Sequence, residues 1–251
     1  ISGYLGMKWG QHASKVMGLA PYGNPDLSIN QVKQIIDINK TNPLKFQNKM
    51  GTIHASLHPR IHQLFEGHRF DNVAAATQLW YEHLITTWIK KAIEITGIKK
   101  IACAGGNFQN VKANQKIMEL DEVDDAFFCP AAGDDGMAVG AALQAYFELT
   151  MLDGICPNKH PLKACYFGSS FENEDIKELL KKHNLLEKSE FFDDVDGELG
   201  ELLSHDEIIA ARFNGQTEWG PRALGNRSIL ANPSNPLMVR KINQAVKKRD
   251  F

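Results

Sequence analysis

Residues 99–136 read KKIACAGGNFQNVKANQKIMELDEVDDAFFCPAAGDDG, a stretch in which short apolar runs alternate with a helical pattern and with glycines. The run 101–104 predicts a buried strand, residues 110–120 a helix, and residues 125–129 a second strand. Residues 137–149 are rich in Ala and Gly and predict a closely packed helix. This order of strand, helix, strand and helix indicates an α/β protein with parallel strands. The loops that follow parallel strands lie at one edge of the sheet, where ligands bind.

The segment before this stretch contains the longest predicted helix, residues 71–97, which Asp71 can cap and Gly97 can end. Its apolar stripe predicts packing in the core rather than a platform for a ligand. The stripe consists of Ala76, Trp80, Leu84, Trp88 and Ala92. Three further predicted segments precede this helix: a short helix at 14–19, a short amphipathic helix at 28–38 and an irregular stretch at 40–70.

The remainder of the chain begins with a connection, residues 150–172, that contains Pro, Gly and Ser. The predicted elements that follow are helices at 173–183 and 196–204, strands at 207–213 and 228–231, and a final helix at 236–248. We place a domain boundary near residue 160, so that the predicted domains are residues 1–160 and 161–251.

The composition is that of an ordinary globular protein, with 251 residues of which 43% are hydrophobic and 23% charged. It excludes collagen-like, disulfide-dense and disordered classes. Lys and Arg number 28 and Asp and Glu number 30, so no field of one sign favours a nucleic-acid or membrane partner. No apolar run approaches the ~18 residues of a membrane span. The chain starts at Ile1 without a secretory signal, and we expect an internal piece of a longer cytoplasmic protein.

Cysteines and histidines are the residue types that most often hold transition metals. Cys103 and Cys129 lie in apolar, strand-like runs and predict buried, reduced thiols. Cys156 and Cys165 flank His160, but no second close pair of ligands supports a metal site there. Three histidines recur every four residues, as on a metal-binding helix, although a proline in this segment argues against an uninterrupted helix. They are His54, His58 and His62.

Two glycine loops follow the two predicted strands. Gly105-Gly106 lacks side chains and precedes a helix, so that a phosphate or a sugar can approach the backbone; a tight turn is the alternative. Residues 133–136, Gly-Asp-Asp-Gly, offer two carboxylates to a divalent metal or a nucleotide hydroxyl; a solvated turn that caps the next helix is the alternative. Because both loops are predicted at one sheet edge, a ligand site is favoured over two separate turns.

The third candidate stretch is residues 216–228, QTEWGPRALGNRS. Arg222 and Arg227 lie in it, among glycines that let the backbone fold back. Arginine forks suit an anionic group such as a phosphate, whereas two surface arginines in a loop are the alternative. From the residues alone, we predict an α/β enzyme that binds a phosphate-bearing ligand.

Together these motifs resemble one family, the O-carbamoyltransferases, which includes nodulation-factor and antibiotic carbamoyltransferases. The resemblance covers almost the whole chain, and its most specific run is Gly-Pro-Arg-Ala-Leu-Gly-Asn-Arg-Ser. The stretches that resemble the family, in the family's order, are Lys15–Gly23, Gly105–Asn114, Pro130–Gly136, Gly220–Ser228 and Asn243–Arg249.

The resemblance implies a fold, which is the second half of an actin-like ATPase domain, like that of threonylcarbamoyl-tRNA enzymes, followed by part of a YrdC-like α/β domain. It also implies that ATP and carbamoyl phosphate form a carbamoyl adenylate, whose carbamoyl group goes to the hydroxyl of a small-molecule acceptor. A divalent metal such as iron(II) is implied, since a metal polarises the carbamoyl carbonyl. The alternatives are an actin-like sugar kinase or ATPase and a non-catalytic nucleotide-binding module. A homodimer is left open.

The resemblance further implies roles for individual residues. Asp134 is implied as a metal ligand, and Arg222 and Arg227 as catalytic arginines at the carbamoyl-phosphate and ATP site. The implied nucleotide-binding residues are Gly105, Gly106, Asn110, Gly133, Gly136 and Asn226. The sequence departs from the family at Gln216 and Trp219, and it contains no counterpart of the family's metal-binding histidine pair. We therefore expect this chain alone not to complete the reaction.

Overall fold

The computed structural model describes the chain except for residues 9, 52–56, 159–161, 163, 206 and 249–251. The chain divides into two compact units, Ile1–Asp134 and Asp135–Phe251, and each contains helices and small sheets. The predicted α/β class is therefore confirmed, while the boundary near residue 160 stays a prediction. Within the described ranges, no helix is both long and apolar enough to cross a bilayer.

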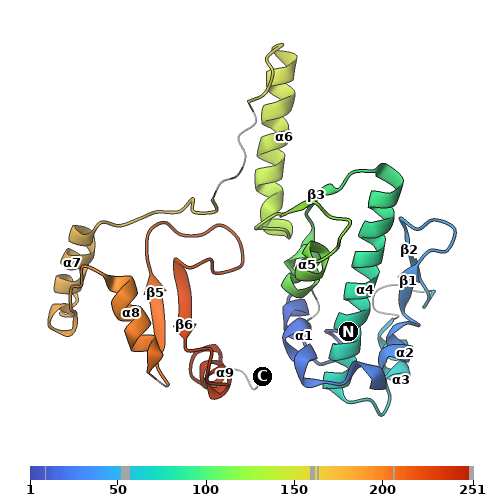
Figure 1. Cartoon of the computed structure of the whole chain (residues 1–251), viewed down its shortest axis with the longest axis horizontal. Helices are drawn as coiled ribbons and strands as arrows, with labels where there is room; N and C mark the ends of the chain where they lie inside the picture. Colours follow the sequence, from blue (N-terminus) through green and yellow to red (C-terminus); the bar gives the residue numbers. More distant parts are fainter. Residues whose placement is uncertain (9, 52–56, 159–161, 163, 206, 249–251) are drawn as a thin grey trace. The chain divides into compact units, whose positions relative to one another are not determined.

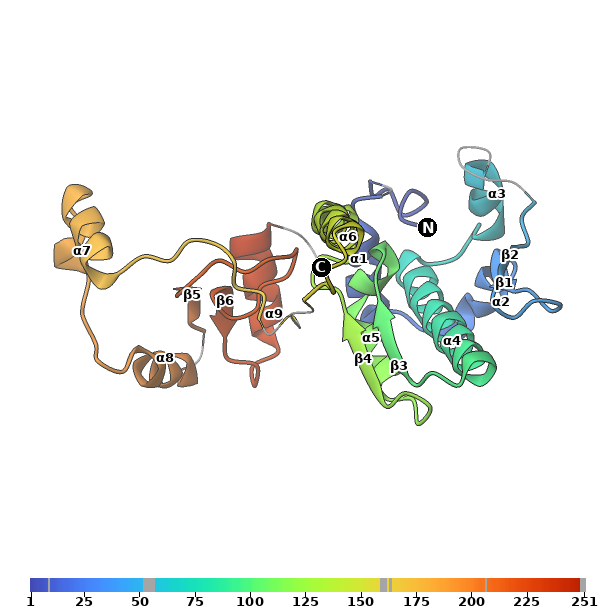
Figure 2. The same cartoon turned by 90° about the horizontal axis from the view of Figure 1, so that it is seen from above.

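The first unit is arranged around its longest helix, α4. Its helices are α1 (Ala13–Leu19), α2 (Ile29–Val32), α3 (Leu57–Leu64), α4 (Phe70–Thr96) and α5 (Val111–Met118). Its strands are β1 (Ile36–Ile38), β2 (Phe46–Asn48), β3 (Lys100–Cys103) and β4 (Asp125–Phe128). Figures 1 and 2 show α4 between the β1–β2 hairpin on one side and α5 with β3 and β4 on the other.

Helix α4 begins earlier than predicted and ends where predicted. The carbonyl of Arg69 accepts the first helical hydrogen bond, from the N–H of Val73 at 3.1 Å, so the cap predicted at Asp71 is wrong. Asp71 lies in the first turn instead, where its carboxylate binds the Arg69 guanidinium at 2.7 Å. At the other end Gly97 has a φ of +69°, the left-handed conformation that commonly ends a helix, which confirms the predicted end.

Two hydrophobic clusters pack against the two ends of α4. The cluster toward the N-terminus of the helix comprises Val32, Ile61, Phe65, Val73 and Ala76. The cluster toward its C-terminus comprises Ile85, Ile89, Ile93, Ala113 and Ile117. The predicted stripe is therefore right only in part. Ala76 and Leu84 are buried, but Trp80 and Trp88 are half-buried, because their polar N–H groups are directed to other partners.

The segment between α2 and α4 corrects two predictions. The helix predicted at 28–38 ends at Val32, and residues 36–38 pair with residues 46–48 in an antiparallel hairpin. The hairpin forms because α4 supplies its partners: the indole N–H of Trp80 donates to the carbonyl of Ile36 at 2.9 Å, and that of Trp88 to the carbonyl of Leu44 at 3.0 Å. The stretch predicted to be irregular also contains α3, whose proline lies in the first turn, where a helix tolerates it.

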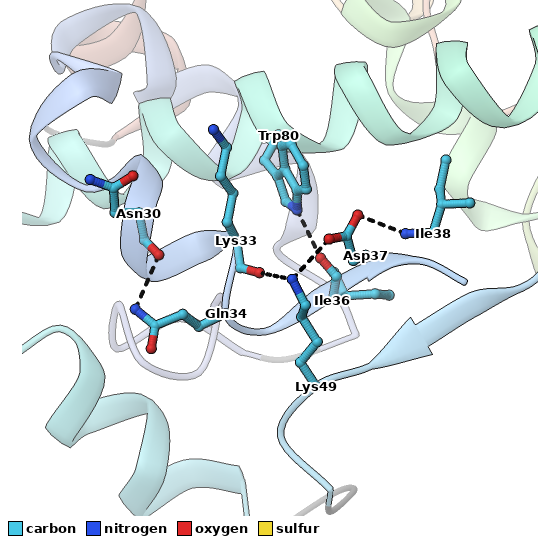
Figure 3. Close-up of polar contacts among 8 residues, drawn as sticks. All are labelled: Asn30, Lys33, Gln34, Ile36, Asp37, Ile38, Lys49 and Trp80. Atoms are coloured by element: carbon cyan, nitrogen blue, oxygen red, sulfur yellow. Dashed lines mark hydrogen bonds and ion pairs between the residues drawn. The ribbon is translucent and has the colours of Figure 1, made fainter. Parts of the chain in front are cut away.

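Lys49 connects the two strands of this hairpin through an ion pair and binds the residue after α2 through a hydrogen bond, as Figure 3 shows. Lys49 Nζ lies 2.8 Å from Asp37 Oδ2 and 3.0 Å from the carbonyl oxygen of Lys33. The hydrogen bond from Lys49 lowers the pKa of Asp37 below its ordinary value. The pair therefore stabilises the fold above that ordinary pKa, and the stabilisation is lost as the pH falls through the lowered one.

We expect Lys49→Ala to lower the free energy of unfolding by less than ~1 kcal/mol at neutral pH, because a partly exposed ion pair contributes little. The difference from the unaltered protein should become smaller at a pH below the lowered pKa of Asp37, where only the hydrogen bond from Lys49 to the carbonyl of Lys33 remains. Urea denaturation at a series of pH values measures both effects. Lys40→Ala, at an exposed position on the same hairpin, is the control for loss of a positive charge. A loss that does not change with pH would contradict the ion pair.

Strands β3 and β4 confirm the predicted strand–helix–strand unit. They pair in parallel, with Lys100 opposite Asp125 and Cys103 opposite Phe128. Helix α5 connects them, and its N-terminus is capped by Asn110, whose side-chain oxygen accepts the N–H of Ala113 at 3.1 Å. The structure thus places the ends of both strands, and the loops that follow them, at one edge of this sheet.

The second unit contains the predicted helices and strands. Most of their first and last residues lie within about two residues of the predicted ones. Its helices are α6 (Met137–Leu152), α7 (Asn173–Lys182), α8 (Val195–Ser204) and α9 (Leu237–Ile242), which continues into a π-helical turn at Asn243–Lys247. Strands β5 (Ile209–Phe213) and β6 (Arg227–Ala231) pair antiparallel. Arg212 on β5 binds Asp196 on α8 at 2.6 Å. Among the described residues of this unit, the buried side chains are those of Met238 and Asn243.

Candidate functional site

The two glycine loops of the first unit meet at the edge of the β3–β4 sheet. The N–H of Gly105 donates to the carbonyl of Ala132 at 2.7 Å, which confirms that the loops lie side by side. Gly105 has a φ of 104° and a ψ of 150°, a backbone conformation that is essentially restricted to glycine. Residues Gly106–Gln109 form the 3-10 turn η4, which leads to Asn110 at the start of α5.

We expect Gly105→Ala to destabilise the first unit by about 1–3 kcal/mol, the usual cost of a Cβ in this backbone region. A Cβ at Gly105 meets open space, so strain in the backbone and not a clash is the cause. Gly106→Ala is the matched control, because Gly106 also has open space around it and has no positive φ. Thermal denaturation of the two variants tests the expectation, and equal melting temperatures would contradict it.

A pocket of about 240 Å³ opens beside the first loop, between α1, the middle of α4 and η4. Its lining includes Ser14, Met17, Thr77, Gln78, Tyr81, Gly106, Asn107 and Asn110. None of the described residues that line it has a charged side chain. A mostly apolar pocket with a few polar, uncharged side chains suits the ring, hydroxyl and amide atoms of a neutral group rather than a phosphate. Sequence analysis predicted Gly106 and Asn110 here but missed the wall that α1 provides.

Two side chains of α4 hold the glycine loop in place. Gln78 and Asn110 exchange hydrogen bonds: Asn110 Nδ2 donates to Gln78 Oε1 at 2.8 Å, and Gln78 Nε2 donates to Asn110 Oδ1 at 3.1 Å. Three residues further along the helix, the hydroxyl of Tyr81 donates to the carbonyl of Asn107 at 2.9 Å. Burial raises the pKa of Tyr81 to about 12, so this phenol stays a hydrogen-bond donor at neutral pH. Neither residue has a distinctive sequence signal, because both lie within an ordinary helical pattern.

The structure describes the predicted metal ligand, Asp134, but not all of the histidines considered as ligands. Asp134 begins the 3-10 turn η5, Asp134–Gly136, and is exposed. Within the described part of the chain, no three His, Cys, Asp or Glu side chains come together as a metal site. His54 and His160 lie outside the described residues. The described residues alone therefore do not complete a metal site around Asp134.

The free cysteines and the second glycine loop complete the predicted residues of this region. Cys103 is buried, as predicted, and burial raises the pKa of its thiol, whereas Cys129 is half-buried because it follows the end of β4. A Cβ at Gly133 would lie 2.5 Å from the side-chain nitrogen of Gln109, so the second glycine loop lies beside the side chain of this η4 residue. Gly136, another of the predicted nucleotide-binding residues, is the N-cap residue of α6.

In the second unit, the loop between β5 and β6 is organised by the carboxylate of Glu218. Its Oε1 accepts the backbone N–H groups of Leu224 at 3.0 Å, Asn226 at 2.7 Å and Arg227 at 2.9 Å. Burial raises the pKa of Glu218, but these hydrogen bonds outweigh it and lower the pKa to about 2. Sequence analysis quoted this residue without assigning it a role. One signal could have pointed to Glu218. It is a single acidic residue that precedes a loop whose backbone N–H groups have no partners in a strand or helix.

Arg227 also shapes this loop. Its guanidinium lies 3.5 Å from the centroid of the Phe213 ring, and each N–H of its two terminal nitrogens has a protein acceptor within hydrogen-bond distance. These acceptors, at 2.6–3.2 Å, are the carbonyl oxygens of Asn214, Gly215 and Asn226 and the hydroxyl of Thr217. The predicted contact of Arg227 with a ligand phosphate stays a prediction.

The remaining residues of the motif lie on the same loop. Asn226 donates from Nδ2 to the carbonyl of Gln216 at 2.8 Å, so its side chain also closes the loop. Arg222 is exposed and lies between Gly220 and Gly225, which have φ values of 114° and 110°. The structure thus brings Glu218, Asn226 and Arg227 together as the frame of the loop and presents Arg222 at its surface.

Known proteins resemble this chain along most of its length. The model of the carbamoyltransferase N-terminus matches residues 1–143, and that of the carbamoyltransferase C-terminus matches residues 200–251. The uncharacterized protein MJ1058 of Methanocaldococcus jannaschii is 34% identical over 98% of this chain and 41% of its own length. Two nodulation proteins, NolO of Bradyrhizobium diazoefficiens and NolNO of Sinorhizobium fredii, are each 32% identical over 94% of this chain, which covers 43% and 34% of their lengths.

The chain therefore spans less than half the length of these relatives. The first family model covers more than half of the residues of this chain and includes both glycine loops and every residue that lines the pocket. The second includes the loop that Glu218 and Arg227 organise. On these matches, the chain belongs to the carbamoyltransferase family.

Proposed function

We propose that this chain is part of an O-carbamoyltransferase. It uses ATP, carbamoyl phosphate and water to form a carbamoyl adenylate, with release of phosphate and pyrophosphate, and transfers the carbamoyl group to the hydroxyl of a small-molecule acceptor, with release of AMP. The observation that carries the proposal is the pocket of the first unit. Two stretches that resemble the family, Lys15–Gly23 and Gly105–Asn114, are far apart in the chain but both contribute to its walls. The family membership supports carbamoyl transfer as the reaction.

The chemistry of the residues supports a division of tasks between the two units. The nucleoside part of ATP is assigned to the uncharged pocket, and the glycine backbone at Gly106 is assigned to its phosphates, because it offers no side chain in their way. Arg222 is assigned to the phosphate of carbamoyl phosphate, since an exposed guanidinium forms paired hydrogen bonds to phosphate oxygens. Arg227 and Asn226 frame the loop that carries it. Asp134 is proposed as one ligand of a divalent metal such as iron(II).

The proposal extends to the fold of the longer relatives. Residues 1–160 are proposed to be the second half of an actin-like ATPase domain, and residues 161–251 part of a YrdC-like domain. A parallel strand–helix–strand unit with its ligand loops at one edge supports the first of these assignments.

The assignment of the pocket is tested by measuring the binding of ATP to this chain with isothermal titration calorimetry. We expect the unaltered chain to bind ATP and Met17→Trp, which fills the pocket, to abolish binding. Met151→Trp is the control, because Met151 is exposed on α6 and far from the pocket in the sequence. Failure of the unaltered chain to bind ATP would contradict the assignment.

The reaction itself is tested with the longest translated product that contains this chain, supplied with ATP and carbamoyl phosphate but no acceptor. We expect carbamoyl adenylate by mass spectrometry and its loss in Arg222→Ala. Phosphorylation of an added hydroxyl compound, without dependence on carbamoyl phosphate, would favour a sugar kinase instead.

A further inference from the structure

The orientation of the Asn110 side chain is controlled by a chain of hydrogen bonds that starts on α4. Glu82 Oε1 accepts a hydrogen bond from Gln78 Nε2 at 2.7 Å. Gln78 in turn exchanges two hydrogen bonds with Asn110, at 2.8 and 3.1 Å. At the far end, Asn110 Oδ1 accepts the N–H of Ala113 at 3.1 Å. All three side chains are half-buried, and Gln78 and Asn110 line the pocket.

The donors and acceptors in this series of hydrogen bonds can be arranged in only one way, because the groups at both of its ends have fixed roles. A side-chain amide can be turned over with little change of shape, so that its oxygen and nitrogen exchange places. A carboxylate accepts hydrogen bonds, so the NH₂ group of Gln78 must face Glu82, which leaves Gln78 Oε1 for Asn110 Nδ2. A backbone N–H donates, so the oxygen of Asn110 must face Ala113. The two constraints agree, and each amide is left with one orientation.

We propose that Gln78 and Glu82 are positioning residues that fix the amide of Asn110 so that it offers an N–H donor, and not its carbonyl oxygen, to the pocket. Asn110 Oδ1 already accepts from Gln78 and from Ala113, whereas Nδ2 has a second hydrogen beyond the one bound to Gln78. The group that Asn110 recognises is therefore a hydrogen-bond acceptor, such as a ring nitrogen or a sugar oxygen of the nucleoside. This inference rests on the proposed binding of ATP in this pocket.

A purely structural role of Gln78, in which it only ties α4 to α5, makes a different prediction. Glu82→Gln preserves the size of the side chain and its ability to accept from Gln78, so a structural tie survives it. The same change removes one of the two constraints on direction, because a second amide can itself be turned over, and it leaves Asn110 oriented by the N–H of Ala113 alone. Gln78→Leu removes the link altogether. The matched control is Glu148→Gln, since Glu148 accepts from Gln144 on α6 at 2.7 Å in the same i,i+4 arrangement.

The first measurement needs no ligand and records the side-chain amide signals of Asn110 in a ¹⁵N-labelled chain. We expect Glu82→Gln and Gln78→Leu to shift these signals and to speed their exchange with water, and Glu148→Gln to leave them unchanged. Unchanged Asn110 signals in both pocket variants would overturn the proposal.

The second measurement is the dissociation constant for ATP. Loss of one well-placed hydrogen bond weakens binding about fivefold to tenfold. We expect a loss of up to this size in Gln78→Leu and a smaller loss in Glu82→Gln, because the N–H of Ala113 still holds the oxygen of Asn110 in both variants. The melting temperature of Glu82→Gln should stay close to that of the unaltered chain. Wild-type affinity in both variants would overturn the positioning role. No ATP binding by the unaltered chain would contradict the proposed function alone, because the amide signals still report the orientation of Asn110.

Discussion

Gly23→Ala is expected to cause the largest loss of stability of any single methyl group added to the first unit. Gly23 follows η1, Ala20–Tyr22, in an extended conformation that every residue adopts, with a φ of −109°. The requirement for glycine is one of space. A Cβ at this position would fall on the carbonyl group of Asp71 in the first turn of α4. Because both partners are backbone, neither can turn aside as a side chain can.

The neighbouring contacts oppose a compensating shift. The N–H of Asn24 donates to Asn72 Oδ1 at 2.8 Å, and both Asp71 and Asn72 are buried. We therefore expect a loss of about 3 kcal/mol or more in the free energy of unfolding, at the upper end of the range for overpacking. Urea denaturation measures it, and hydrogen exchange at the start of α4 locates it.

Gly18→Ala provides the matched comparison. Gly18 lies within α1, and a Cβ there meets no atom within 4 Å. Alanine forms helix more readily than glycine, so this variant is expected to be more stable by about 0.5–1 kcal/mol. A Gly23→Ala chain as stable as the unaltered one would show that the segment after α1 does not lie against α4 as described.

Glu218→Ala is expected to have the largest effect in the second unit. The substitution removes the acceptor of three backbone N–H groups at once, at Leu224, Asn226 and Arg227. The loop then loses the contacts that curve it around Arg222. We expect at least tenfold faster hydrogen exchange at these three amides and, in the longer protein, loss of carbamoyl adenylate formation. Glu190→Ala, at an exposed position, is the control.

The same carboxylate predicts how the loop responds to acid. The pKa of Glu218 is lowered to about 2, so the ionised form is favoured by the folded loop. The stabilisation is present above the ordinary pKa of a glutamate and is lost only as the pH falls through about 2. Protection of the three amides should therefore persist when the exposed carboxylates of the chain have become protonated. Loss of protection near the ordinary glutamate pKa would contradict this account.

The sequence predicted the parallel strand–helix–strand unit because its signals are local. The apolar run 101–104, the cap at Asn110 and the proline after the second strand each act on their immediate neighbours. The β1–β2 hairpin was missed for the opposite reason. Its carbonyl groups at Ile36 and Leu44 are bound by tryptophans 44 residues later, and no pattern within the hairpin contains that information.

The candidate site divides in the same way. Glycines and arginines, such as Gly105 and Arg222, were predicted as site residues because the residue type alone suggests their role. Gln78 was missed because its partner Asn110 lies 32 residues away, and Glu218 was missed because its role is to accept from backbone, which every residue carries. The sequence thus predicted groups that we propose to meet a ligand, and the structure was needed to find the groups that hold them.

The two hydrophobic clusters lie at the two ends of one helix of 27 residues, and none of residues 77–83 between them is buried. Such a helix is about 40 Å long. We expect the parts of the first unit at its two ends, here called the two blocks, to unfold separately, because the stretch between them, here called the seam, contains no buried residue. The pocket opens at that seam, since Gln78 and Tyr81 belong to it. A ligand bound there bridges the blocks, and unfolding with ligand should be a single sharp transition where the free protein melts in a broader one. The ligand would then make the unfolding of the first unit cooperative.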